Sequence, residues 1–498
     1  MALKMKAKTL SRFLMAAALL PLLLLLQACP SEIEPQDDEE KAKIAADADY
    51  KAKSFLRSQY MDVYYWWRDD VKDRNATLKP YDYDMYDFFD AMLYKDDRWS
   101  WMCDKEYYIS DETGVISGTW GISLGQAVEY YKDYGLRVRY IYPGSPFEKY
   151  GVTRGAVLTH INGQNVEDRT DSPFTNEKLK IYQNNFFTSP QTFTFRLIDG
   201  RDTTFTASML SELQTHTNLV TRIFQPEEFP GLTAPVGYFH FLAFKANFLS
   251  DIAQSMTYFH DNGIRNLIVD LRYNGGGDSR ASDTLMTYLA PRSAVGKPYV
   301  VRKHNSYLGK LDDSFKDENN TYNIGSNANA LDLDRIYFIT GAGTASASEM
   351  VMNGLKPYLG DKMQMVGDTT YGKPNGMYVL MYPGTNDDYK AYNKGDYAKL
   401  KWVFLPIAFF NQNSEGESIP WNGFVPNNYR PDDLYHDFGV EESDINACLT
   451  HLVSGSWPDL PKATRRTTTK SAYEPGYRID TEEDRAGYGL DLVRKTRF

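Results

Sequence analysis

The second half of this chain alternates short apolar runs with helical patterns, and this alternation restricts the fold more than any other feature. From Val236 onward, each apolar run is followed by a stretch in which apolar residues recur every three or four positions. The order is typical of an α/β core with partly parallel strands, because parallel strands are usually joined by a crossover helix. We expect strands at 236–244, 267–271, 335–340, 363–367, 377–382 and 402–410, and helices at 249–259, 279–289 and 346–358.

Two regions with other patterns precede this core. Residues 48–112 carry apolar residues at helical spacing, which predicts an N-terminal helical region. Residues 114–210 hold short strand-like runs, glycines and Asn162-Gly163, the preferred pair for a tight hairpin turn, so we expect a β-rich domain there. The core is then expected over 211–455, with a long asparagine-rich surface loop at 305–333, and a C-terminal extension is expected over 456–498.

The first 29 residues have the pattern of an export signal. A basic start is followed by a nearly uninterrupted apolar run at 13–26, which is shorter than the about 20 residues of a membrane-spanning helix. Leu26-Gln27-Ala28-Cys29 then resembles a lipobox, which predicts lipidation of Cys29. The alternative is an ordinary secretory signal followed by a chance cysteine.

Residues 30–47 are acidic and poor in apolar side chains, which predicts a disordered tether. Such acidic tethers resemble the surface-export signals of Bacteroidota lipoproteins, but a plain solvated linker is the favoured interpretation. We therefore expect a lipid-anchored protein in the cell envelope of a Gram-negative bacterium, either periplasmic or exposed on the surface.

Composition excludes several functions. The net charge is −11 and no long basic run lies outside the signal and a short tail, so we expect no nucleic-acid partner. No His-Glu-x-x-His run, Cys-x-x-Cys pair or EF-hand loop occurs, so no metal or other cofactor is expected. After Cys29 only Cys103 and Cys448 remain. They could pair in an export compartment or stay as two free buried thiols.

A candidate nucleophile lies in Gly343-Thr344-Ala345-Ser346-Ala347-Ser348-Glu349. Ser346 follows an expected strand and opens an expected helix, where α/β folds place their sites. The N–H of Ala347 would be available there to bind an oxyanion. Ser346 and Glu349 also match a helix capping box, which by itself needs no function.

A candidate base is Lys373, which ends the stretch Gly367-Asp368-Thr369-Thr370-Tyr371-Gly372-Lys373. The glycine spacing matches a phosphate-binding P-loop up to the lysine, but Pro374 replaces the Mg²⁺-binding Ser or Thr, so we expect no nucleotide. A serine needs a neighbour to take its proton, and an uncharged lysine can do so. A surface lysine in a turn is the alternative.

A Ser-His-Asp triad is not favoured, since the histidines lie in unrelated contexts and none is expected to pair with an obvious acid. His160 and His240 lie in expected strands and are interpreted as packing residues. A glycine-rich loop, Asp270-Leu271-Arg272-Tyr273-Asn274-Gly275-Gly276-Gly277-Asp278, leaves an expected buried strand. Its N–H groups could bind a phosphate or a developing oxyanion, or the loop could simply be a tight turn.

Together these segments resemble the carboxyl-terminal processing (tail-specific) serine–lysine peptidase family, whose members carry an inserted PDZ domain. The resemblance covers roughly residues 114–430, and the order of the three loops is what makes it specific. Three stretches resemble conserved parts of the PDZ domain and the strand that re-enters the core: 145–158, 161–163 and 236–238. The implied fold is α/β and multidomain, with an N-terminal helical region, a PDZ-like β-rich domain and a crotonase/ClpP-like serine protease core.

The resemblance implies a role for each site residue. Ser346 would be the nucleophile and Lys373 the general base, and Glu349 would be a supporting residue. Ala347 with Gly275 or Gly276 would form the oxyanion hole. Pro374 replaces a glycine of many members, and Met377 replaces a glutamine that orients the lysine in some, so a third catalytic residue stays open.

The PDZ resemblance implies a binding site for the C-terminal tails of protein or peptide substrates. Trp120, Gly121 and Ile122 would form the loop that receives the terminal carboxylate, by strand addition at a sheet edge. A plain strand edge is the alternative. The sequence therefore predicts an envelope-anchored serine endopeptidase that acts through an acyl-enzyme. The rival is a catalytically degenerate lipoprotein that binds a peptide or partner.

Overall fold

The computed structural model describes residues 37–67, 71–127, 133–167 and 176–460. The predicted signal peptide, Cys29 and most of the C-terminal extension lie outside the described residues. The described residues divide into two compact units, 37–109 with 303–319 and 375–410, and 110–302 with 320–374 and 411–460. No helix in the described part has the length and apolar character that a membrane-spanning helix needs.

The centre of the second unit is a six-stranded sheet in the order β10-β11-β12-β15-β16-β21. All neighbours from β11 to β21 are parallel, and only β10 is antiparallel. The α/β class expected from the alternating pattern is therefore confirmed. The strands span Asn218–Phe224, Val236–Phe241, Asn266–Asp270, Arg335–Thr340, Met363–Gly367 and Asn428–Tyr429 in that order.

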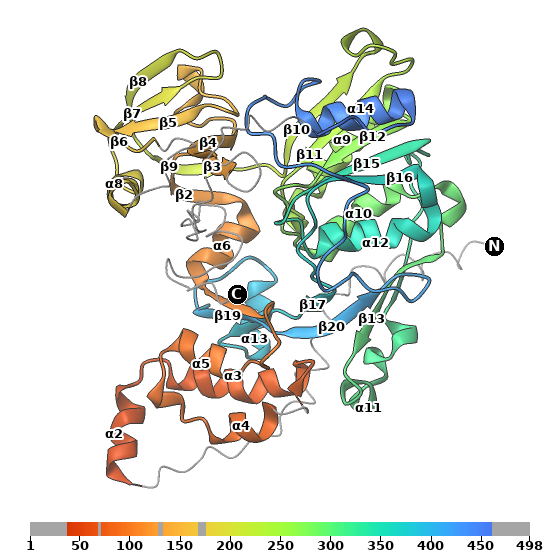
Figure 1. Ribbon diagram of the computed structural model, residues 1–498. Coiled ribbons are helices and arrows are strands. Elements are labelled where there is room, and N and C mark those ends of the chain that lie inside the picture. Colours follow the sequence, from red (N-terminus) through yellow and green to blue (C-terminus); the bar gives the residue numbers. More distant parts are fainter. Residues whose placement is uncertain (1–36, 68–70, 128–132, 168–175, 461–498) are drawn as a thin grey trace, which may run out of the picture. The chain divides into compact units, whose positions relative to one another are not determined.

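Helices cover both faces of this sheet (Figure 1). On one face α9 (Leu249–Asp261), α10 (Ser279–Leu289) and α12 (Ala347–Leu359) pack on the side chains of alternate strand positions, such as Phe239, Leu267 and Phe338. On the other face α14 (Ser443–Ser454) packs on the intervening positions, such as Tyr238, Ile268 and Tyr337. Burial on both faces explains why these strands are continuously apolar.

The loops that follow β12, β15 and β16 share one edge of the sheet, because these three strands are parallel neighbours. They are the glycine loop after Asp270, the serine loop after Thr340 and the lysine loop after Gly367. In α/β sheets this carboxyl edge is where sites form.

Residues 115–214 form a separate β module within the second unit. Its sheet runs β3-β4-β5-β7-β8, with β6 paired to β5. The chain enters on β2 (Val115–Thr119) and leaves on β9 (Leu210–Gln214), and these two strands pair antiparallel with each other. The predicted Asn162-Gly163 hairpin is confirmed, with φ of 51° and 75°. The other elements are β3 (Ile122–Ala127), β4 (Asp133–Ile141), β5 (Val157–Ile161), β6 (Gln164–Asn165), α8 (Asn176–Phe186), β7 (Gln191–Arg196) and β8 (Asp202–Ala207).

The first unit is largely helical. Its helices include α3, whose Lys53 is buried and donates to Asp47 Oδ2 at 2.9 Å and to the carbonyl oxygen of Pro80 at 3.2 Å. A three-stranded sheet, β1-β19-β18, completes the unit. The elements are α2 (Asp38–Ala46), α3 (Tyr50–Val63), α4 (Lys72–Thr77), α5 (Met85–Ala91), β1 (Trp101–Asp104), α11 (Leu308–Leu311), β17 (Asn375–Met377), β18 (Leu380–Tyr382), α13 (Asn386–Tyr392) and β19 (Trp402–Leu405).

Several expectations were wrong in part. The strands expected at 377–382 and 402–410 are each divided in two, into Asn375–Met377 with Leu380–Tyr382 and into Trp402–Leu405 with Ile407–Gln412. Within 48–112, residues Trp101–Asp104 form a strand because they pair with β19. Within the expected tether, Asp38–Ala46 is helical, since Asp37 caps its first turn by accepting from the Glu40 N–H. Residues 305–333 are not simply a surface loop. They contain α11, two short helical turns and β14 (Thr321–Asn323), and they bury Leu308, Phe315, Ile324, Leu331 and Leu333.

Candidate active site

Ser346 ends the serine loop directly before α12, and its backbone is strained. Its φ of 56° and ψ of −113° lie in a region that non-glycine residues rarely occupy. The side chain is half-buried, whereas Ala345 and Ala347 on either side are buried. Strain of this kind is typical of a serine held at a sharp turn between a strand and a helix. Ala347 opens the helix, where the first N–H groups have no partner within the helix.

Glu349 ties the serine loop to the lysine loop. Its Oε2 accepts from the N–H of Ser346 at 3.0 Å and from the N–H of Lys373 at 2.8 Å. Its Oε1 accepts from the N–H of Gly372 at 2.8 Å and from the hydroxyl of Thr370. Because one oxygen binds both N–H groups, the backbone nitrogens of Ser346 and Lys373 lie no farther apart than these two bonds together.

The carboxyl group of Glu349 is fully buried. Burial raises the pKa of Glu349, while the hydrogen bonds from Thr370, Lys373, Gly372 and Ser346 act in the opposite direction. A second link joins the same loops, since the N–H of Tyr371 donates to the carbonyl oxygen of Thr344 at 2.9 Å. Lys373 itself is half-buried. The candidate nucleophile and base therefore lie on two loops fixed to each other at several points.

Asn274 organises the glycine loop against the serine loop. It is fully buried, and its carbonyl oxygen accepts from the Ala345 N–H at 3.2 Å and from the Ser348 hydroxyl at 3.0 Å. Its side-chain Oδ1 accepts from the Gly276 N–H at 2.9 Å. Sequence analysis did not single out this asparagine, because an asparagine in a glycine-rich turn is common and carries no distinctive signal.

The glycine loop touches the candidate nucleophile at Gly276. A Cβ on this residue would lie 2.7 Å from Ser346 Cβ and 2.8 Å from the Ala347 nitrogen, so only glycine fits. Since the Gly276 N–H already donates to Asn274, it is a poor oxyanion donor in this arrangement. The exposed Gly275, the other candidate, is the better one. Together with Ala347 it would offer two donors to an oxyanion at Ser346.

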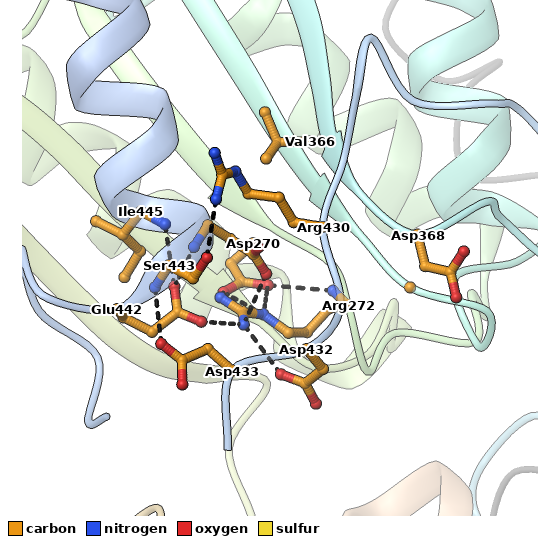
Figure 2. Close-up of polar contacts among 12 residues, drawn as sticks. Asp270, Arg272, Val366, Asp368, Arg430, Asp432, Asp433, Glu442, Ser443 and Ile445 are labelled. Carbon is orange, nitrogen blue, oxygen red and sulfur yellow. Dashed lines mark hydrogen bonds and ion pairs between the residues drawn. The ribbon is translucent and has the colours of Figure 1, made fainter. Parts of the chain in front are cut away.

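A buried polar network supports the start of the glycine loop (Figure 2). Arg272 pairs with Asp270 at 2.7 Å, with Glu442 at 2.5 Å and with Asp432 at 3.1 Å. Glu442 also caps α14, accepting from the N–H of Ile445 at 3.0 Å. The network thus joins the carboxyl end of β12 to the first turn of α14.

The β module contributes a second arginine to this network. Arg154 is buried and donates to the Tyr273 hydroxyl at 2.7 Å and to Asp432 Oδ1 at 2.7 Å. Because Tyr273 belongs to the glycine loop, Arg154 connects the module directly to that loop. Sequence analysis did not predict Arg154, which stands in an ordinary turn before Gly155.

The network has more carboxyl groups than guanidinium groups. The pKa values of its carboxyl groups therefore shift in opposite directions. Burial acts to raise the pKa of Asp270, but the charges of Arg272 and His240 and the hydrogen bonds from Arg272 and Tyr238 together outweigh burial and leave this pKa below its usual value. Burial and the neighbouring Glu442 raise the pKa of Asp444 well above its usual range. We infer that Asp444 is the neutral member, which lowers the cost of burying the cluster.

The residues expected to bind a substrate terminus lie at one end of the β module. Trp120 is fully buried, stacks on Phe147 and donates from Nε1 to the Phe186 carbonyl oxygen. The Gly121 N–H donates to Thr119 Oγ1 at 3.0 Å. Ile122 begins β3, which stands at the end of the strand order. Trp120 therefore supports the loop from inside the module rather than lining a surface.

Other chemistries find little support in the part of the chain that the structure describes. These residues hold no cluster of histidine, cysteine and acidic side chains suited to a metal ion. Cys103 and Cys448 are both free and buried, so they are not paired. The expectation that no histidine pairs with an acid was wrong, because His436 lies 2.7 Å from Asp433 and His216 lies 3.3 Å from Asp251.

Comparison with known proteins identifies a family model and a curated relative that match this chain. Residues 235–391 match the model of Peptidase family S41. A curated relative, carboxyl-terminal-processing peptidase 3 (chloroplastic) of Arabidopsis thaliana, is 24% identical over 243 residues. That match spans 46% of this chain and 41% of the relative, so the chain covers less than half of that relative's length.

Solved structures resemble this chain to different degrees. A Bacteroides fragilis protein assigned to the S41 proteases superposes with a TM-score of 0.60 at 20% identity, covering 81% of this chain and 97% of that one. The photosystem II D1 C-terminal processing protease matches with a TM-score of 0.40 at 17% identity, covering 76% and 92% of the two chains. The first of these likenesses supports the mixed α/β, multidomain architecture.

Proposed function

Since residues 235–391 match the model of Peptidase family S41, we propose that this chain is a serine endopeptidase with Ser346 as nucleophile and Lys373 as general base. The observation that carries the proposal is the Glu349 carboxylate, which binds the backbone N–H groups of both residues on one oxygen. A glutamate buried for capping alone would not need to bind the lysine loop.

The proposed reaction follows the order of a serine acyl transfer. The uncharged amine of Lys373 accepts the proton of the Ser346 hydroxyl as its oxygen attacks the peptide carbonyl. The N–H groups of Ala347 and Gly275 stabilise the oxyanion, each donor contributing about 3 kcal/mol to the transition state. The lysine then gives its proton to the leaving amine, and a water activated by the same lysine hydrolyses the acyl-enzyme.

Substrate capture is proposed at the β module, acting as a PDZ domain. The end position of β3 in its sheet leaves an edge to which the C-terminal tail of a substrate could add as a strand. The loop of Gly121 and Ile122, held from inside by Trp120, would receive the terminal carboxylate. Lipidation of Cys29 would hold the enzyme at a membrane of the cell envelope.

The dyad is tested with the full chain in detergent and an unfolded protein as substrate. Ser346→Ala and Lys373→Ala should each lower the cleavage rate by about 10³-fold or more. Lys390→Ala is the matched control, because Lys390 is an exposed lysine on α13 that pairs with Asp387 on the surface. Cleavage at the wild-type rate by either dyad variant would exclude this mechanism. If neither the wild type nor any variant cleaves the substrate, the catalytically degenerate binding protein is favoured.

A further inference from the structure

The loop between β20 (Ile407–Gln412) and β21, residues 413–427, is fixed to the nucleophile helix. Asn413 Nδ2 donates to the Asn353 carbonyl oxygen at 3.2 Å, and Asn353 Nδ2 donates to the Glu417 carbonyl oxygen at 3.0 Å. An ion pair of 2.8 Å between Lys356 and Glu417 adds a surface link. The first part of the loop therefore moves with α12.

The second part of the same loop is fixed to the lysine loop. The Thr370 N–H donates to the Phe424 carbonyl oxygen at 3.1 Å, and the Phe424 N–H donates to Thr370 Oγ1 at 2.7 Å. Thr370 in turn donates to Glu349, so one hydrogen-bonded path leads from this loop to the carboxylate that holds both dyad residues.

Backbone packing beside the lysine is equally close. A Cβ on Gly372 would lie 2.2 Å from the carbonyl oxygen of Trp421 and 2.5 Å from the nitrogen of Gly423. No side chain fits between the two segments. The backbone of Trp421 therefore packs directly against Gly372, the residue before Lys373. This close packing fixes the position of the Trp421 backbone.

Two large apolar side chains are exposed on this rigid frame. Trp421 is 47% exposed and Val425 is 75% exposed, although their neighbours Ile419 and Gly423 are buried. Isolated exposed apolar residues are ordinary. A tryptophan presented on a fixed backbone beside the loop that carries the proposed base is different, because tryptophan residues often dominate binding energy where peptides or proteins meet.

We propose that Trp421, assisted by Val425, determines specificity by binding an apolar side chain of the substrate on the leaving-group side of the scissile bond. This inference rests on the proposed peptidase function. The base that takes the serine proton must later reach the leaving amine, so the leaving-group side of the substrate lies beside Lys373. Trp421 adjoins the lysine loop, whereas the oxyanion donors come from the glycine loop and α12.

The test compares matched peptides that differ only at the two positions after the cleaved bond, bearing Leu or Phe in one set and Gly in the other. With the full chain, Trp421→Ala should lower kcat/KM for the apolar peptides by about tenfold or more, and by less than about twofold for the glycine peptides. Val425→Ala should give the same pattern with a smaller loss. Tyr258→Ala and Val295→Ala are the controls, at sites 46% and 42% exposed.

A second readout separates this inference from the proposed function. Binding of the same fluorescent peptides to Ser346→Ala protein, with and without Trp421→Ala, measures recognition without cleavage. Trp421-dependent affinity for apolar peptides supports the inference even if the wild-type chain cleaves nothing. Equal losses for both peptide sets, no loss, or a loss that follows residues before the cleaved bond would each overturn it. Trp421→Leu provides a milder variant if the alanine protein melts early.

Discussion

One carboxylate, that of Glu349, aligns the candidate site although it reaches no reacting atom. Each of its oxygens accepts two hydrogen bonds from the serine and lysine loops. An amide in its place would turn one acceptor into a donor that faces other donors. Because this buried carboxylate binds donors of both loops, we expect it to hold Ser346 and Lys373 in place. Glu349 is therefore a positioning residue.

Glu349→Gln should therefore lower kcat by about 100-fold while KM changes by less than about threefold, because misplacement by about 1 Å costs that much. The free energy of unfolding should fall by about 1–3 kcal/mol, since buried donors lose their acceptor. Steady-state kinetics and urea unfolding measure the two effects. Glu227→Gln, an exposed glutamate with the same substitution, should change neither. An unchanged kcat in Glu349→Gln would contradict the assigned role.

Asp283 on α10 gives a second residue-scale prediction, about stability. Its Oδ1 is buried and has no hydrogen-bond partner among the described residues. Burial raises the pKa of Asp283 to about 6. Since this lies above the value in the unfolded chain, folding is favoured when the group is protonated, and that contribution is lost as pH rises through about 6.

Asp283→Asn removes this pH-dependent cost. The variant should gain stability relative to the wild type as pH rises, by about 2 kcal/mol between about pH 4 and pH 7. Urea unfolding of both proteins across that range measures the difference. If the difference in free energy of unfolding between the two proteins stays constant or shrinks as pH rises, burial does not raise the pKa of this carboxyl group.

At the scale of elements, the site depends on three loops packed backbone to backbone at the carboxyl edge of the sheet. Gly276 makes one of these contacts, with φ of 102° and no room for a Cβ beside Ser346. Gly276→Ala should lower kcat by about 100-fold or more, because the serine or the loop must shift. Gly343→Ala is a matched control in the serine loop itself, since a Cβ there meets nothing within 4 Å. Equal activities of the two variants would contradict this packing.

Many of the strands and helices could be predicted from the sequence, because buried strands leave a recognisable apolar pattern. Buried parallel strands such as Arg335–Thr340 and Met363–Gly367 have continuous apolar runs, so their limits were confirmed residue for residue. The strand at Trp101–Asp104 was missed, because it forms only by pairing with residues far along the chain. Asn274 and Trp421 were missed as well. Their roles come from what the fold places beside them, which no local pattern records.

At the scale of the whole molecule, the β module contacts the core through a buried arginine, Arg154, and through aromatic contacts such as that of Tyr140 with Tyr273. Arg154 reaches Tyr273 of the glycine loop and Asp432 of the segment before α14. Breaking a buried ion pair from one side costs about 3–5 kcal/mol, because the remaining charges stay buried. Stability of the site loop and placement of the module should therefore be linked.

Arg154→Met tests this link. We expect the free energy of unfolding to fall by about 3 kcal/mol or more. Hydrogen exchange should also rise in both the glycine loop and the module turn around Gly155. Arg201→Met is the control within the module, because Arg201 pairs with Asp199 on the surface, where ion pairs contribute little to stability. Faster exchange confined to the module alone would show that the two parts are independent.

The paired strands β2 and β9 bring the entry and exit of the β module side by side, with Thr119 opposite Leu210. A segment whose two ends already touch can be excised and its stumps joined by a short turn without stretching what remains. The core would then keep its sheet but lose the contact of Arg154 with the glycine loop, and the shortened chain would show how much of the proposed peptide cleavage survives without the proposed tail capture.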